Sequence, residues 1–69
     1  MTINYDSKTD LLYLMIEPAA DGEIINKRVS EEIVLDIGEN DKIVGIEIMD
    51  ASKHVNLEKL MPVNYQQAL

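Results

Sequence analysis

The chain contains no cysteine, tryptophan or phenylalanine, and its three aromatic residues are all tyrosines. The absence of cysteine excludes a disulfide framework and a thiolate zinc site, so no covalent or thiolate-metal link stabilises the fold. A chain of 69 residues buries only about 60% of the surface that its unfolded form exposes. We therefore expect association with a second copy to add stability.

Basic residues are also few, with 6 Lys and Arg against 13 Asp and Glu and a net charge of -7. This balance argues against nucleic acid and against anionic membranes as partners, because both require basic side chains, but it suits a basic protein partner. The first residues, Met1–Asp6, carry neither the charged nor the apolar region of a signal peptide. No apolar run approaches the length that spans a membrane. We expect a soluble cytoplasmic protein that does not bind membranes.

Five segments carry the apolar patterns of β-strands. They are Ile3–Tyr5, Leu11–Glu17, Glu23–Val29, Ile33–Ile37 and Ile43–Met49. The connections are short and rich in Asp, Asn, Ser and Gly, which favours antiparallel neighbours. The third segment contains three consecutive polar residues, which are typical of an edge strand.

The segment after the last strand contains signals for helix starts and a helix end. Asp50 or Ser52 can cap a first turn, Asn56 a second, and Pro62 ends any helix there. We predict an α+β fold in a single domain, residues 1–69. A small antiparallel β-meander sheet of four to five strands over about residues 2–49 packs against a short C-terminal helical element at about 51–61, and a tail follows at 62–69.

Alternation along the strands divides the sheet into two faces. The apolar face, which the helix should cover, holds Leu12, Leu14, Ile16, Val44, Ile46, Ile48, Ile33, Leu35 and Ile37. The second face, half apolar and half acidic, holds Leu11, Tyr13, Met15, Ile43, Glu47, Met49, Val34 and Asp36. Apolar patches of that size usually bind something, so we predict a contact surface there, most simply for a second copy.

Three segments together resemble the YuzE-like family, a domain of unknown function in bacteria and archaea. They are Tyr5-Asp6 through Asp10-Leu11-Leu12-Tyr13-Leu14, Ile33-Val34-Leu35-Asp36, and Val44-Gly45-Ile46-Glu47-Ile48-Met49-Asp50-Ala51-Ser52. The resemblance covers residues 3–54 and implies a β-meander with a C-terminal helical element, but no activity. Some family members are described beside genes assigned as toxin genes, which implies an antitoxin-like role for those members.

Glu47 interrupts an apolar strand, and Asp36 should point to the same face. A partly buried carboxyl group with a raised pKa can serve as a general acid or base, and two such groups can act on a glycosidic bond. The chain has no tryptophan to stack on a sugar, however, and carboxylates in sheets commonly pair across strands. We favour a structural role in which Glu47 pairs with Lys27, Arg28 or a partner chain.

His54 is the only histidine, and it follows Asp50 and Ser52 closely. This spacing invites a catalytic triad, or a metal site of His54 with Asp50 or Glu58, but there is no nucleophile elbow and a single histidine is weak support for zinc. Capping explains Asp50 and Ser52 without catalysis. We predict no catalytic residue, no metal and no cofactor.

Two functional hypotheses follow from these features. The first is a homodimeric protein-interaction module with a basic protein partner, antitoxin-like in its specific form, with contact positions at Tyr13, Met15 and Met49. The second is a small enzyme or ligand-binding protein whose acidic site, formed by Asp36, Glu47 and His54, lies at the dimer interface.

Overall fold

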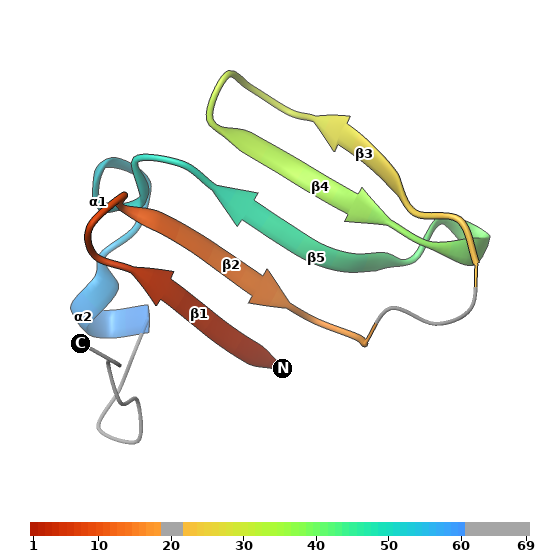
Figure 1. Cartoon of the computed structure of the whole chain (residues 1–69), viewed down its shortest axis with the longest axis horizontal. Coiled ribbons are helices and arrows are strands. Elements are labelled where there is room, and N and C mark those ends of the chain that lie inside the picture. Colours follow the sequence, from red (N-terminus) through yellow and green to blue (C-terminus); the bar gives the residue numbers. More distant parts are fainter. Residues whose placement is uncertain (19–21, 61–69) are drawn as a thin grey trace.

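The computed structural model describes residues 1–18 and 22–60. Over these residues the chain forms one five-stranded sheet with two short helices at one end (Figure 1). The elements in chain order are β1 (Thr2–Asp6), β2 (Leu11–Met15), β3 (Ile25–Arg28), β4 (Ile33–Ile37), a 3-10 turn (Glu39–Asp41), β5 (Ile43–Ile48), α1 (Ala51–His54) and α2 (Leu57–Leu60). The predicted α+β class, the antiparallel meander and the helical element after it are confirmed. The predicted tail, 62–69, lies outside the described residues.

The strand order across the sheet is β1-β2-β5-β4-β3, and every neighbouring pair is antiparallel. A β1-β2 hairpin and a β3-β4-β5 meander make up the sheet, and they join where β5 pairs with β2. The strands β1 and β3 are therefore the edges. All four residues of β3 are exposed, as expected for the edge strand that its charges predict.

A β-bulge at Val44 ends β2 early and changes the face of Ile43. The amides of Ile16 and Glu17 both donate to the Val44 carbonyl, at 2.8 and 3.2 Å, so regular pairing of β2 stops at Met15. In β5 the register shifts between Gly45, which lies opposite Asp36, and Ile43, which lies opposite Ile37. Cross-strand partners share a face. The prediction that Ile43 lies on the same face as Tyr13 is therefore wrong. The extra residue reverses the alternation, so Ile43 lies on the face of Ile37.

The start of α1 also differs from the prediction. Asp50 lies in the left-handed region, with φ 50° and ψ 49°, and its side chain makes no capping bond. The carboxylate of Asp10, in the β1-β2 turn, instead accepts the Ser52 amide at 3.1 Å. Asn56 does cap α2, because its side-chain oxygen accepts the Lys59 amide at 3.2 Å, as predicted.

The core lies where the helices meet the sheet. Its buried members are Leu12, Ile48 and Ala51. Packed against them are Ile3, Tyr5, Leu14, Ile33, Ile46, Val55, Leu57 and Leu60. We call this side of the sheet the helix-side face and the opposite side, which carries Tyr13 and Glu47, the open face.

Candidate functional site

Four polar side chains from four adjacent strands meet on the open face. Tyr13 of β2 lies opposite Glu47 of β5, and Asp36 of β4 lies between Gly45 of β5 and Asn26 of β3. We call Tyr13, Asn26, Asp36 and Glu47 the polar cluster. Tyr13, Asp36 and Glu47 belong to the face predicted as a contact surface, and the antiparallel register places the three together.

Asp36 is the centre of the polar cluster and is only 7% exposed. The Tyr13 hydroxyl donates to its Oδ2 at 3.0 Å, and the Asn26 amide donates to its Oδ1 at 2.5 Å. A buried carboxylate is tolerated only with such partners, because burial removes its hydration. Glu47 lies on the same face as Asp36, opposite Val34 of the same strand. The prediction that Asp36 and Val34 are exposed on this face is wrong, because both side chains are buried within the chain.

Gly45 makes room for the Tyr13 ring. A Cβ atom at position 45 would overlap the Tyr13 hydroxyl and lie 2.7 Å from Cζ of the same ring. A strand glycine commonly marks such a close approach. The glycine thus lets the tyrosine cross β5 to reach Asp36 on β4.

The environment of the polar cluster changes the acidity of two of its groups. Burial raises the pKa of Glu47, the negative charge of Asp36 raises it further, and Arg28 opposes both effects. Burial also raises the pKa of Tyr13, as does its hydrogen bond to Asp36. Each shift has the sign expected when an anion is moved from water toward another anion. Tyr13 therefore stays a hydroxyl donor at neutral pH.

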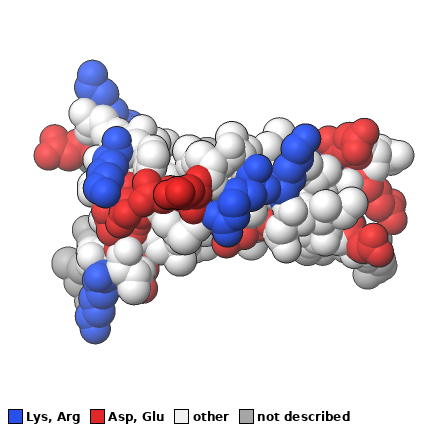
Figure 2. Space-filling view, turned by 90° about the horizontal axis from the view of Figure 1, so that it is seen from above, with Lys and Arg blue, Asp and Glu red and all other residues white. Residues whose placement is uncertain are grey.

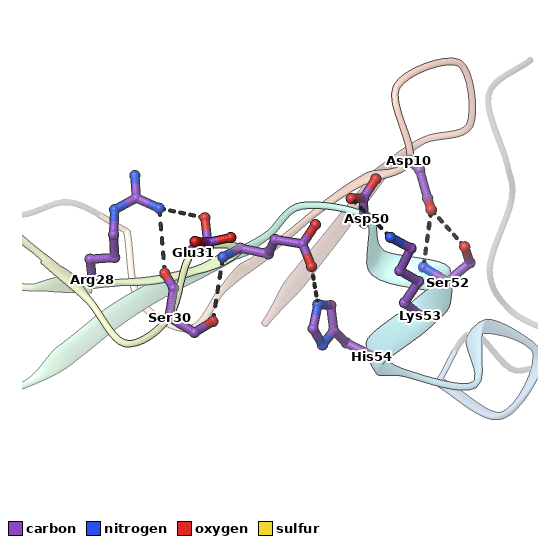
Figure 3. A network of polar contacts seen from close by, with 9 residues as sticks. Asp10, Arg28, Ser30, Glu31, Asp50, Ser52, Lys53 and His54 are labelled. Carbon is purple, nitrogen blue, oxygen red and sulfur yellow. Dashed lines mark hydrogen bonds and ion pairs between the residues drawn. The ribbon is translucent and has the colours of Figure 1, made fainter.

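A second network, which sequence analysis missed, joins the β1-β2 turn to α1 (Figure 3). Asp10 accepts hydrogen bonds from the Ser52 amide at 3.1 Å, from the Ser52 hydroxyl at 2.6 Å and from the Tyr5 hydroxyl at 2.8 Å. Ser52 is thus a donor to a distant carboxylate rather than a cap. Only the run of turn residues from Asp6 to Asp10 hints at this role.

Replacing Asp10 with asparagine should lower stability at neutral pH and reduce the acid sensitivity of the fold. The hydrogen bonds from Ser52 and Tyr5 hold the pKa of Asp10 below its ordinary value of 3.8. A lowered pKa stabilises the fold above the unfolded value, and this contribution disappears as pH falls through the folded one. Urea unfolding of both proteins from about pH 2 to 7 measures the effect. Parallel stability curves would contradict it.

The side chains proposed for a triad lie near one another but do not form one. His54 contacts Glu32 of the β3-β4 connection at 2.9 Å, and Lys53 lies 3.6 Å from Asp50 (Figure 3). Ser52 bonds Asp10 and makes no contact with His54 that would activate it. Hydrogen bonding to Glu32, followed by the charge of Lys53, lowers the pKa of Asp50. These are surface polar contacts, and the one between His54 and Glu32 joins α1 to the β3-β4 connection.

The remaining candidates are dispersed. Met15 lies opposite Gly45 beside the polar cluster, whereas Met49 lies in the turn before α1, where its amide donates to the Glu32 carbonyl at 2.8 Å. His54 contacts Glu32 in the other network. It is therefore separate from the Asp36–Glu47 pair, and the three do not line a common site. Within residues 1–18 and 22–60, no group of three His, Asp or Glu side chains is arranged to hold a metal.

The helix-side face continues beyond the core as a ladder of isoleucines. Ile25 of β3, Ile37 of β4 and Ile43 of β5 lie opposite one another at the end of the sheet away from the helices. Ile25 is 59% exposed and Ile43 41%. We call these three residues the outer ladder. The cluster of core contacts among the described residues stops short of it, at Leu14 and Ile46.

Comparison with known proteins gives one match. The model of a family described as "Protein of unknown function (DUF2283)" matches residues 2–52, from β1 to the first turn of α1. No curated protein and no solved structure matches the chain. None of the helices in the described part of the chain is both long and apolar enough to cross a membrane.

Proposed function

Because this chain belongs to the DUF2283 family of proteins of unknown function, we propose a function from its own residues: it is a homodimeric protein-interaction module of the cytoplasm that binds a basic protein partner. The observation that carries the proposal is the outer ladder. Three aligned isoleucines, two of them more than two-fifths exposed, extend an apolar face past the end of its helical cover. Contiguous apolar surface of this kind marks interaction sites.

The distribution of charge supports a second copy as the occupant of this face. Asp6, Asp36 and Glu47 all lie on the open face, and Lys27 is the single charged strand residue on the helix-side face of the described sheet. Interface centres are depleted of charge in this way. Two copies can therefore stack these faces even though each chain carries a net charge of -7.

Acidic side chains support the basic partner. One group of them lies at the end of the molecule opposite the helices and another lies nearer the helices, as the view from the β3 side shows (Figure 2). A hollow of about 230 Å³ at the end opposite the helices is lined by Glu17, Glu23 and Glu39, with Lys42 as the one basic residue among the described residues that line it. Clustered charge of one sign speeds the encounter with a partner of opposite charge. Inhibition of a basic protein, the antitoxin-like role, is the specific form of this proposal.

Sedimentation equilibrium of the intact chain tests the dimer. We expect a mass of twice 7.8 kDa at micromolar concentration, with little change between low and high salt, because apolar burial is not screened. Co-purification with a basic protein should instead weaken as salt rises. A monomer at every concentration would contradict the dimer, and co-purification that does not respond to salt would contradict the acidic contact.

The alternative, a small enzyme or ligand-binding protein, is supported by the raised pKa of Glu47 alone. Asp36 is buried and both of its oxygens already accept hydrogen bonds from the protein, while His54 lies in the other network. We therefore rank this alternative second.

A further inference from the structure

The Tyr13 ring lies along the sheet, whereas a strand side chain ordinarily stands roughly perpendicular to it. Its hydroxyl reaches Oδ2 of Asp36 at 3.0 Å, and β5 lies between the strands of the two residues. A Cβ atom at Gly45 would lie 2.7 Å from Cζ and 3.0 Å from Cε1 of the ring. The half-buried ring therefore lies over the backbone of β5, with one side toward the strand and the other toward solvent.

The neighbours of Tyr13 on the open face are acidic, apolar or small. Glu47 of β5 lies opposite Tyr13 on one side, and Asn4 of β1 lies opposite it on the other. Leu11 and Met15 precede and follow Tyr13 by two positions in β2, so both share its face. Leu11 is 37% exposed. The ring is thus bordered by a carboxyl group on the next strand and by apolar side chains along its own.

The charge of the open face suits a cation as the ligand of this ring. In the described sheet the charged side chains of this face are Asp6, Asp36, Glu47 and Arg28, three acidic against one basic. The guanidinium of Arg28 donates to the backbone carbonyls of the β3-β4 connection at 3.4 and 2.6 Å, and so points away from the ring. The outer side of the ring is therefore left for a group from another molecule.

We propose that Tyr13 and Glu47 form a binding site for an arginine side chain of the basic partner. A guanidinium is a planar cation that stacks on an aromatic face and still presents N–H donors at its edge, so it can bind the Tyr13 ring and the Glu47 carboxyl group together. The methylene stem of the arginine would lie against Leu11 or Met15. Gly45 and Asp36 are positioning residues, because they hold the ring flat.

This inference rests on the basic partner of the proposed function and adds where that partner binds. A second copy on the helix-side face leaves the open face accessible, so the dimer and the arginine site are compatible. The site lies on the sheet itself, whereas the hollow lined by Glu17, Glu23 and Glu39 is a separate acidic surface. The two surfaces can therefore be tested against each other.

NMR titration of the intact chain with two synthetic peptides tests the site. The peptides have equal length and charge, and arginine is the only basic residue of one and lysine of the other. We expect the arginine peptide to bind about three- to tenfold more tightly, because the lysine ammonium is a strongly hydrated point charge that does not stack. The ring signals of Tyr13 should shift on binding, whereas those of Tyr5, which packs against the core, should not.

Three variants separate the ring, the charge of the site and the charge of the hollow. Tyr13→Leu removes the ring and should abolish the preference for arginine. Glu47→Gln keeps the ring and should weaken the binding of both peptides. Glu39→Gln is the matched control, because it removes the same charge from the hollow and should leave the preference and the Tyr13 shifts unchanged.

Equal affinities of the unaltered chain for the two peptides, or binding of the arginine peptide without a shift of the Tyr13 ring signals, would overturn the proposal. Neither result depends on whether the Tyr13 variant folds. Binding that Glu39→Gln weakens and Glu47→Gln does not would also overturn it, while leaving the basic partner in place at the hollow. If neither peptide binds, the basic partner itself is contradicted, and the arginine site with it.

Discussion

Replacement of Gly45 by alanine is expected to lower the free energy of unfolding by about 2.5–6 kcal/mol. The new methyl group would overlap the Tyr13 hydroxyl, so the ring must leave its position over β5. Its hydrogen bond to Asp36 is then lost, and a nearly buried carboxylate loses one of its donors. Overpacking costs about 1–3 kcal/mol and a lost bond to a charged group about 1.5–3 kcal/mol, which is the basis of the range. Urea unfolding at neutral pH measures the change.

The Tyr13→Ala background tells overpacking apart from a general intolerance of alanine at position 45. With the ring absent, the methyl group of Gly45→Ala no longer meets Tyr13, the source of the three nearest atoms. The cost of Gly45→Ala should then fall close to zero, and the two changes should be strongly non-additive. Equal costs in both backgrounds would mean that the close approach of the Tyr13 ring to β5 does not cause the loss of stability in Gly45→Ala.

Ile43→Glu should weaken the proposed dimer by at least about a hundredfold while leaving the monomer folded. Ile43 is 41% exposed at the start of β5, so a charged side chain there is tolerated in the single chain. In a face-to-face dimer the same position lies in the interface. A two-fold axis would bury the carboxylate twice, once from each copy. Sedimentation velocity over a dilution series measures the dissociation constant.

Leu11→Glu is the matched control for the interface. Leu11 is 37% exposed, close to the value for Ile43, but it lies opposite Asp6 on the open face. A glutamate there changes charge and hydropathy by the same amount and should leave the mass in solution unchanged. If Leu11→Glu dissociates the dimer and Ile43→Glu does not, then the second copy binds the open face, as the alternation of the sequence had suggested.

The strand pattern was sufficient to predict which side chains share a face, apart from one bulge. Tyr13, Asp36 and Glu47 lie on one face as the period of two requires, and Leu12 and Ile48 lie under the helices on the other. The edge character of β3 follows from its polar residues. These features depend on local alternation, which each segment carries by itself.

Features that depend on distant pairing could not be predicted. The burial of Asp36 requires that β2, β5 and β4 be adjacent and in a particular register, because only then does the Tyr13 ring cross Gly45 to reach it. The bulge at Val44 reverses the side of Ile43, and no residue type announces it. The contact between Asp10 and Ser52 joins residues 42 positions apart. Local sequence contains no information on which of several carboxylates a helix start will meet.

The order β1-β2-β5-β4-β3 also has a consequence for how the chain folds. The β1-β2 hairpin and the β3-β4-β5 meander each close only short loops, whereas the seam between β2 and β5 is the step that must overcome the entropy of a long loop. Asp10 lies at one end of this seam and Ser52 just beyond it, so their hydrogen bonds form only after the two halves have met. The Asp10 carboxylate therefore stabilises the start of α1 only after β2 and β5 have paired, so we expect α1 to form together with the complete sheet.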